Sequence, residues 1–348
     1  MSFLENCWYV ASWSDALIRE PLTRTILDRP VVLYRRADGT PVALEDRCCH
    51  RALPLSMGTI EGDDVRCGYH GLKFDPSGAC VEVPGQSTIP PGARVQSYPV
   101  AEKWNAVWIW MGAPERADVS SIPDVFWLDD PGWTPAPGHL RVEANFQLLI
   151  DNLLDLTHVS YLHRTTLAGD AVEAVTPVTT RRDGDRVTVG RWILDVAAPP
   201  LYSKASGITG PVDRWQWITW EAPANVYFDI GCARAGTGAP DGDRSHGVSM
   251  WSTHLITPET ETSTHYFFSF TRDFKLGDAE VTRILSEGSR TAFNEDLEVL
   301  ETQQRAQDAS PNAPRIDIKI DQGPLQARRT LAKLIEGERR EQRKQAAE

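Results

Sequence analysis

The sequence has no long apolar run, and this absence limits the kinds of protein it can encode. No stretch reaches the roughly 18 consecutive apolar residues that a membrane-spanning helix needs. The opening MSFLENCWYV has no basic segment followed by an apolar one, so a secretory signal is not expected either. We therefore expect a cytoplasmic protein that is not bound to a membrane.

Positive charge and cysteine are both scarce. The 348 residues hold 36 Lys and Arg against 48 Asp and Glu, a net charge of −12, which argues against nucleic acid as a partner. The 6 cysteines are scattered along the chain, a pattern that favours free thiols or metal ligands over a disulfide framework. They are Cys7, Cys48, Cys49, Cys67, Cys80 and Cys232.

The patterns that are present divide the chain into two domains. As far as Gly112, short runs rich in Val, Ile and Tyr alternate with turn signals such as ADGT and DPSG, which predicts a small all-β domain. The following segment, 113–133, is rich in Pro, Asp and Ser. We place the domain boundary inside it, giving domains 1–117 and 118–348.

The second domain mixes helical and strand patterns. Residues 145–163 have a helical period, 174–273 have the pattern of successive strands separated by turns, and 278–308 and 322–345 are again helical. The predicted fold class is therefore α+β, with one antiparallel sheet and helices packed on a face.

Two short loops in the first domain carry cysteine and histidine together. DRCCHRALPL contains Cys48 and His50, and CGYHGLKF contains Cys67 and His70. Three interpretations are open: a coincidence of buried side chains, a structural zinc site, or a [2Fe-2S] cluster with cysteines on one iron and histidines on the other. Glycine and arginine in or beside both loops argue against coincidence, and we favour the cluster.

NLLDLTHVSYLH in the second domain offers a second site. Asn152, Asp155 and His158 are three residues apart and share one helical face, whereas His158 and His163 are five apart. For both histidines to bind one metal, the helix must loosen near 159–162, through a π-bulge or a break. Taken alone, two surface imidazoles are an equally good interpretation.

Asp296 supplies a third ligand to this site. In RTAFNEDLEVLETQQ it falls on the apolar stripe of Phe293, Leu297 and Leu300, and a carboxylate on a buried face is costly unless it is paired or metal-bound. A buried structural ion pair is the alternative. Two histidines and one carboxylate are the ligand set of mononuclear non-haem iron oxygenases, which keep positions open for O₂.

CCHRALPLSMG and CGYHGLKFDPSG resemble the Rieske motif. The resemblance implies that Cys48 and Cys67 bind one iron and that His50 and His70 bind the other. Cys49 departs from the motif, where proline or a small polar residue is more common. It is the spacer rather than a ligand, and we expect it to be a small buried residue, as we do the remaining three cysteines.

The whole chain resembles the α subunits of Rieske non-haem iron oxygenases, in the branch of vanillate O-demethylase, dicamba demethylase and toluenesulfonate methyl-monooxygenase. The motif D-x-x-H-x-x-x-x-H, WYVASW, THLITPETET and DQGPLQARRTLAKLI carry this resemblance. It implies a Rieske domain, a helix-grip (START-like) catalytic domain, Fe(II) on His158, His163 and Asp296, and a head-to-tail homotrimer. Asp155 would link the metals through His70 of the neighbouring subunit, and Asn152 is a further catalytic candidate.

The same resemblance implies a reaction. A separate flavin and iron–sulfur reductase would pass NAD(P)H electrons to the cluster, and O₂ would oxidise an aromatic acid. We expect O-demethylation of a methoxybenzoate such as vanillate. Hydroxylation of an aryl methyl group is the alternative, and an electron carrier with an inactive second site is a further one. We expect the strands to line the substrate pocket. His254 matches a position that contacts the substrate acid group in some relatives; otherwise it is a half-exposed strand histidine.

Overall fold

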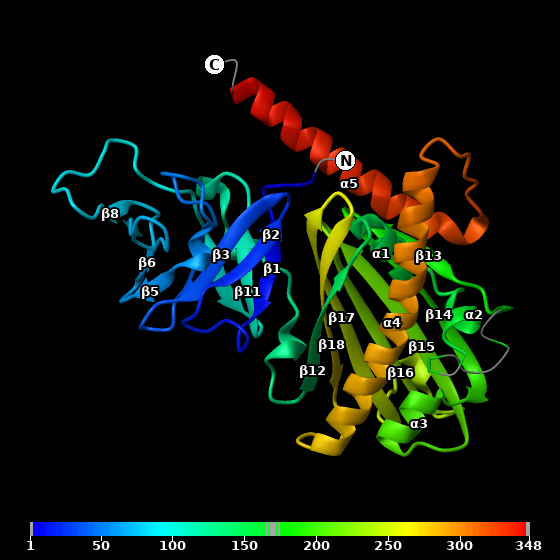
Figure 1. Cartoon of the computed structure of the whole chain (residues 1–348). Helices are drawn as coiled ribbons and strands as arrows, with labels where there is room; N and C mark the ends of the chain where they lie inside the picture. The colour runs from blue at the N-terminus through cyan, green and yellow to red at the C-terminus, as the bar shows by residue number, and fades with distance from the viewer. Residues whose placement is uncertain (1–2, 165, 168–171, 173–174, 346–348) are drawn as a thin grey trace. The chain divides into compact units, whose positions relative to one another are not determined.

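The computed structural model describes residues 3–164, 166–167, 172 and 175–345, and it divides into two compact units (Figure 1). Unit 1 is Met1–Asp124 with Thr257–Glu261, and unit 2 is Val125–Ile256 with Thr262–Glu348. Unit 1 thus runs past residue 117, because Trp8 and Trp104 tie the Pro-rich segment to the β domain. Their indole N–H groups donate to the carbonyls of Asp118 and Pro123, at 2.8 and 3.0 Å.

Unit 1 consists of three small antiparallel sheets, with strand orders β1-β11-β10, β2-β3-β4-β9 and β5-β6-β7-β8. The strands are β1 Trp8–Trp13, β2 Leu22–Ile26, β3 Arg29–Arg35, β4 Pro41–Glu45, β5 Thr59–Glu61, β6 Asp64–Arg66, β7 Lys73–Phe74, β8 Cys80–Glu82, β9 Ser97–Tyr98, β10 Val100–Lys103 and β11 Ala106–Trp110. One core cluster of this unit contains Cys48 and Cys67, packed with Leu44 and Phe74. The thiols of the two predicted loops therefore lie in one apolar core.

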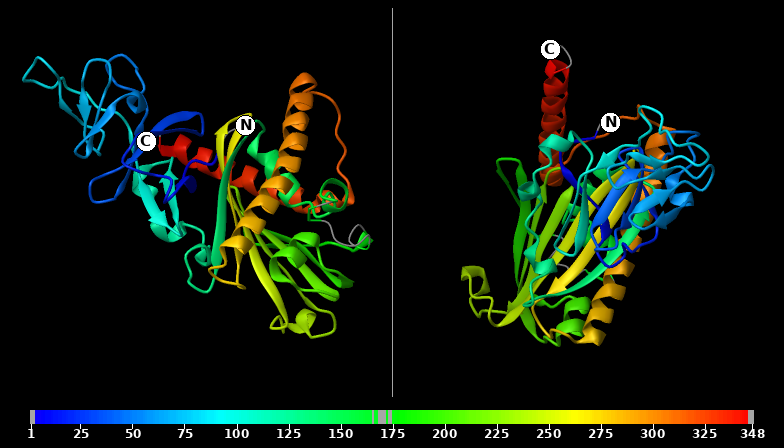
Figure 2. Two further views of the ribbon diagram at one scale, coloured as in Figure 1. Left: turned by 60° about the horizontal axis from the view of Figure 1, so that its bottom comes forward. Right: turned by 90° about the vertical axis from the view of Figure 1, so that its left-hand side faces the viewer.

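Unit 2 is built on one seven-stranded antiparallel sheet, in the order β12-β18-β17-β16-β15-β14-β13 (Figures 1 and 2). The strands are β12 Thr134–Val142, β13 Thr179–Asp183, β14 Arg186–Ala197, β15 Pro211–Glu221, β16 Asn225–Arg234, β17 Gly247–Thr260 and β18 Ser263–Arg272. The sheet confirms the predicted α+β class. β12 was not predicted. Its prolines, Pro135 and Pro137, weaken the strand signal and suit the sheet edge that it occupies.

The helices of unit 2 are α1 Phe146–Leu153, α2 Val159–Leu162, α3 Pro200–Ser206, α4 Ala279–Ala309 and α5 Gln322–Gln345. The longest, α4, begins where the Asp278 side chain accepts hydrogen bonds from two backbone N–H groups, and it crosses one face of the sheet. Its Phe293 packs edge-on against Tyr266 and Phe268 of β18, with ring centroids 5.5 and 4.7 Å apart. This contact fixes the side of α4 that carries Asp296. No helix in the described part of the chain combines the length and the apolar content needed to cross a membrane.

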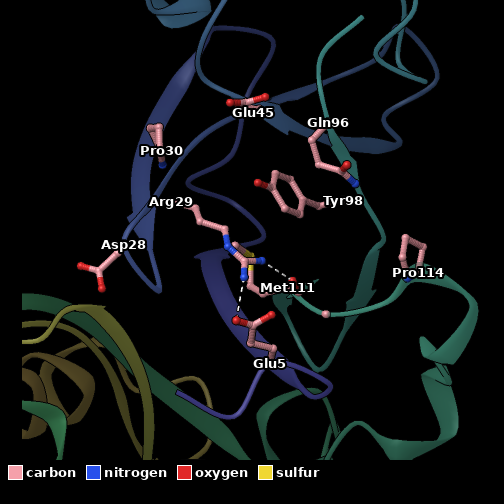
Figure 3. Close-up of a pocket in the computed structure, with 10 residues that line it drawn as sticks. Glu5, Asp28, Arg29, Pro30, Glu45, Gln96, Tyr98, Met111 and Pro114 are labelled. Carbon is pink, nitrogen blue, oxygen red and sulfur yellow. Dashed lines mark hydrogen bonds and ion pairs between the residues drawn. The ribbon is translucent and has the colours of Figure 1, made fainter. Parts of the chain in front are cut away.

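A cavity of about 450 Å³ opens in unit 1 (Figure 3). Arg29 lines it, and it pairs with Glu5 at 2.8 Å and donates to the Met111 carbonyl at 2.6 Å. Tyr98 and Glu45 complete its polar wall, and its described lining contains no cysteine or histidine. The redox chemistry indicated by the sequence therefore lies elsewhere.

Candidate metal centres

Cys48 and Cys67 begin two loops with the same backbone pattern, one after β4 and one after β6. The backbone N–H of each cysteine donates to the carbonyl of the residue five positions later, which is Leu53 or Leu72. The carbonyl of each cysteine accepts from the N–H of the residue four positions later, and the four distances are 2.8 to 3.1 Å. Ala52 and Gly71 close these turns in the left-handed region, with φ of 57° and 71°. The two loops are thus equivalent scaffolds that hold a thiol in the same way.

The four candidate ligands of this first centre divide into an inner and an outer pair. Cys48 and Cys67 are 3% and 2% exposed. Burial raises the pKa of the Cys48 thiol to about 11, so a bound cation is needed to form the thiolate. His50 and His70 are exposed, with ring centroids 4.5 Å apart. This arrangement fits a [2Fe-2S] cluster with thiolates on the buried iron and imidazoles on the outer one.

Two details around this centre concern residues between the ligands. Gly68 lies so close to the other loop that a Cβ there would be 2.7 Å from the Met57 carbonyl oxygen. Cys49 is exposed, so the prediction that it is buried is wrong: its side chain points out of the core that takes Cys48. Of the other three, Cys80 and Cys232 are buried and Cys7 is half-buried, and all six cysteines are free.

The second centre is carried by a broken helix. α1 ends at Leu153, residues 154–158 are not helical, and α2 is a single turn. The break therefore comes before His158 rather than at 159–162, where we predicted it. Asp155 makes the break, because its side chain accepts from the Thr157 N–H at 2.7 Å and competes with the helical hydrogen bonds.

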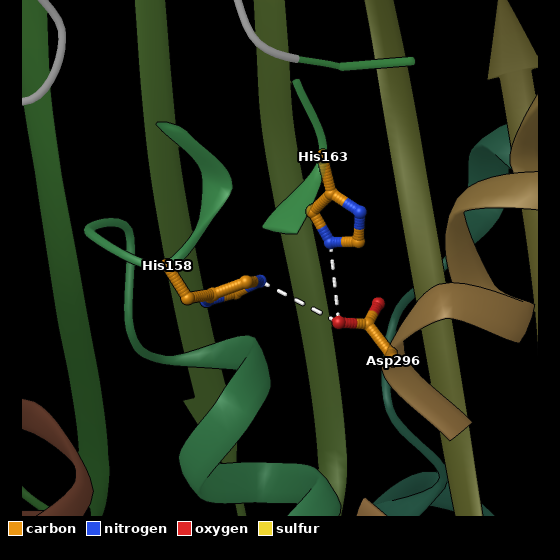
Figure 4. A group of neighbouring side chains, drawn as sticks. All are labelled: His158, His163 and Asp296. Atoms are coloured by element: carbon orange, nitrogen blue, oxygen red, sulfur yellow. Dashed lines mark hydrogen bonds and ion pairs between the residues drawn. The ribbon is translucent and has the colours of Figure 1, made fainter. Parts of the chain in front are cut away.

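The break brings His158 and His163 to Asp296 of α4 (Figure 4). Nε2 of His163 lies 3.1 Å and Nε2 of His158 lies 3.6 Å from Asp296 Oδ1. Each of the three residues offers one ligand atom, and these three atoms lie within 4.8 Å of one another. Ligands bonded to one metal at about 2.1 Å are roughly 3 Å apart, so this donor set fits a single iron with open positions. Asp296 is 4% exposed, as the apolar stripe indicates.

Neighbouring side chains orient these groups. His163 Nδ1 lies 2.7 Å from Glu295 Oε2, and Asn152 Nδ2 donates to Asp296 Oδ1 at 2.9 Å. Burial alone would lower the pKa of His163, but its hydrogen bonds to Asp296 and Glu295 outweigh burial and raise it. Burial lowers the pKa of His158 and favours the neutral imidazole that binds metals. Sequence reasoning missed Glu295, although it directly precedes Asp296 in a helical segment.

A groove of about 560 Å³ reaches this centre. Asn152, Asp155 and His158 line it, together with residues of α4 and α5. Its walls are formed by helices and loops. The Asp155 carboxylate is 26% exposed, so a group from outside the unit can reach it.

His254 lies in the core of unit 2, on β17. It is 0% exposed, so the alternative of a half-exposed strand histidine is wrong. Its Nδ1 is 2.6 Å from the Tyr266 hydroxyl and its Nε2 is 2.9 Å from Ser252 Oγ. Burial lowers its pKa to about 3, so the ring is neutral near pH 7.

Two family models match the chain. The Rieske [2Fe-2S] domain matches residues 7–99, and the vanillate O-demethylase oxygenase C-terminal domain matches residues 142–337. The first match favours the iron–sulfur cluster over a zinc site at the two loops. The second covers the segments that carry His158, His163 and Asp296.

Individual proteins are similar over nearly the full length. The iron–sulfur subunit of the toluene-4-sulfonate monooxygenase system of Comamonas testosteroni is 45% identical, over 97% of this chain and 98% of that protein. The vanillate O-demethylase oxygenase subunit of Pseudomonas sp. (strain HR199 / DSM 7063) is 36% identical, over 97% and 96%. The crystal structure of dicamba monooxygenase with non-haem iron and dicamba superimposes with a TM-score of 0.83 at 33% identity, covering 97% of this chain and 100% of that one.

These relatives are oxygenase components, which sets aside the electron-carrier alternative. The cofactors are a Rieske [2Fe-2S] cluster and mononuclear iron. The chain belongs to the Rieske non-haem iron oxygenases, in the branch that shares the vanillate O-demethylase oxygenase C-terminal domain.

Proposed function

We propose that the protein is the terminal oxygenase that oxidises a methyl carbon of an aromatic acid, with electrons from NAD(P)H through a separate reductase. The observation that carries this proposal is the convergence of His158, His163 and Asp296 on one point. In such a reaction NAD(P)H supplies an electron pair, one oxygen atom enters a C–H bond and the other leaves as water. The free cysteines and the need for a reductase favour the cytoplasm.

Two kinds of methyl carbon are candidates for the attack. The O-methyl group of a methoxybenzoate such as vanillate is the one expected from the sequence. The aryl methyl group of an acid such as toluene-4-sulfonate gains support from the 45% identity to a toluene-4-sulfonate monooxygenase subunit, against 36% for vanillate O-demethylase. We favour the aryl methyl group and keep O-demethylation as the second candidate.

Each residue of the second centre has a distinct task in this proposal. His158, His163 and Asp296 hold the iron, which supplies the activation of O₂ when bound. Glu295 holds the His163 ring so that Nε2 faces the metal position, and Asn152 restrains the Asp296 carboxylate. Phe293, which is 4% exposed one turn before Asp296, excludes water from that side.

The first centre passes electrons on. Cys48 and Cys67 would hold the buried iron of the cluster, and His50 and His70 the exposed one. Exposed imidazoles suit this role, since the partner that receives the electron must approach them closely. We propose that Asp155 accepts a hydrogen bond from His70 of a second copy in a homotrimer, which is supported by its accessible carboxylate in the groove.

His254 remains a candidate for the substrate acid group. With a pKa near 3 it would act as a neutral hydrogen-bonding group and not as a cation. Both ring nitrogens already have partners, so contact with a substrate would require one of the bonds to Ser252 or Tyr266 to be exchanged.

Turnover with paired substrates tests the reaction. The purified protein is supplied with a flavin and iron–sulfur reductase, NADH and either vanillate or toluene-4-sulfonate. Release of formaldehyde identifies attack on the O-methyl carbon, and formation of a benzylic alcohol identifies attack on the aryl methyl carbon. Failure to oxidise any member of a wider panel of methyl- and methoxy-substituted aromatic acids would contradict the proposed substrate class.

Mixed assemblies test whether electrons cross between copies. Copies with Cys67→Ser would lack the cluster, and copies with His158→Ala would lack the mononuclear iron. Each variant alone should be inactive. Co-expressed copies should recover part of the activity if the cluster of one copy serves the iron of another, and none if transfer stays within a chain.

A further inference from the structure

The two oxygens of the Asp155 carboxylate have different surroundings. Oδ1 accepts from both the backbone N–H and the hydroxyl of Thr157, at 2.7 and 2.6 Å. Oδ2 lies 3.9 Å from His158 Nδ1, which is too far for a hydrogen bond. One oxygen is therefore held by the protein's own loop, and the other remains available as an acceptor.

The loop that carries Asp155 is itself anchored from the sheet. Arg191, which is 2% exposed on β14, donates through Nη2 to the Leu156 carbonyl at 3.2 Å and through Nε to Gln216 at 2.8 Å. The backbone between Asp155 and Thr157 is thus fixed. The remaining freedom is rotation of the carboxylate about its own bond, and the Thr157 hydroxyl opposes that rotation.

We infer that Thr157 is a positioning residue for electron transfer: its hydroxyl fixes the Asp155 carboxylate so that Oδ2 is offered to the partner imidazole in the groove. The inference rests on the proposed role of Asp155 as the contact between the two metal centres. Two donors on one oxygen define the plane of the carboxylate, and a hydrogen bond to a charged acceptor is among the stronger ones in proteins. Without the hydroxyl, the carboxylate samples orientations in which Oδ2 turns away, and fewer encounters transfer an electron.

Thr157→Val and Thr157→Ser separate the hydroxyl from the rest of the side chain. Valine keeps the shape, the β-branch and the backbone N–H but removes the hydroxyl, whereas serine keeps the hydroxyl. Asp155→Asn serves as the reference for loss of the contact itself. Ser160→Ala is the matched control, because it removes a hydroxyl from α2 that has no hydrogen bond to Asp155.

The measurement is the rate at which the reduced cluster is oxidised in the holoprotein. Protein reduced by dithionite and freed of excess reductant is mixed with O₂ and an excess of vanillate or toluene-4-sulfonate, and the cluster absorbance is followed. O₂ is the final electron acceptor, and the iron-dependent rate is the difference from protein stripped of mononuclear iron. We expect Thr157→Val to slow this rate roughly tenfold. Thr157→Ser and Ser160→Ala should react as the wild type, and iron content should be unchanged in all three.

The outcomes distinguish failure of this inference from failure of the proposed function. If Asp155→Asn is slow but Thr157→Val is normal, or if Thr157→Val loses iron, the positioning role is wrong while the contact through Asp155 stands. If Asp155→Asn is also normal, or the wild type has no iron-dependent rate, the proposed contact itself is wrong. A crystal structure of holo Thr157→Val provides the direct check, since the inference requires a reoriented or disordered Asp155 carboxylate.

Discussion

At the scale of single residues, the second centre depends on a histidine held between two carboxylates. His163 contacts Asp296 through Nε2 and Glu295 through Nδ1, so its ring has one defined orientation. Asp296 could be predicted as a metal ligand because its charged side chain lies on the apolar stripe of a helix. Glu295 could not, because a half-buried glutamate in a helix resembles any solvated charge until His163 is placed beside it. The exposure of Cys49 was missed for a similar reason, since a spacer can face either way.

Glu295→Gln should weaken the binding of iron by about 10- to 100-fold, because the substitution removes the charge that orients His163. Competition with a ferrous chelator under anaerobic conditions measures the affinity. Glu298→Gln is the control, as Glu298 is exposed on the same helix. Equal iron affinity in Glu295→Gln and the wild type would show that the contact does not support the metal.

The buried His254 should cause part of the loss of stability at acid pH. Its pKa is lowered by burial from the ordinary 6.5 to about 3. Between these values the unfolded chain binds a proton at this residue that the folded chain does not, so acidification favours unfolding. The unfolding free energy should fall as the pH is lowered through 5. In His254→Gln this fall should be less steep than in the wild type, by about 1.4 kcal/mol per pH unit. Urea unfolding at a series of pH values measures this, with His246→Gln as the control at an exposed histidine. An unchanged slope would mean that His254 is protonated in the folded protein.

At the scale of elements, the break between α1 and α2 is the feature that builds the second centre. The five-residue spacing of His158 and His163 showed that a regular helix could not serve, but it could not locate the break. Its position follows from Asp155, whose side chain bonds to Thr157 two residues on. Such local side-chain hydrogen bonds compete with the backbone hydrogen bonds of a helix. A sequence shows which residues can form them, but not at which residue the helix breaks.

The ion pair of Asp151 and Arg328 ties α1 to α5, and both are elements whose residues line the groove. Arg328 Nε donates to the two carboxylate oxygens at 3.0 and 2.9 Å, and Nη2 makes a further contact. Arg328→Met should lower the unfolding free energy by about 1–2 kcal/mol, a value reduced by the partial exposure of both groups. Arg340→Met, which breaks an exposed pair with Glu336 on α5, should cost less than about 0.5 kcal/mol. Chemical denaturation of both variants checks the difference, and equal losses would contradict it.

At the scale of the whole molecule, period and turn signals predicted the β domain, the large sheet and the bounds of α4 and α5 closely. They did not predict which strands become neighbours. β12 pairs along its full length with β18, Thr134 opposite Arg272, although most of the domain lies between them in sequence. Pairing between distant segments is decided by burial of the whole sheet, which no local pattern contains. The contact that joins Asp118 to the first unit is likewise non-local, since its carbonyl accepts from the Trp8 indole 110 residues earlier in the chain.

The most direct test of the two-centre assignment is the metal content of His158→Ala beside that of the wild type, both purified without O₂. The wild type should be red-brown and hold about three irons per chain, two in the cluster with acid-labile sulfide and one mononuclear. His158→Ala should keep the cluster spectrum and the sulfide, lose about one iron, and be inactive. Retention of the full iron complement with normal turnover would contradict the assignment of the second centre, and loss of the cluster spectrum would contradict the separation of the two.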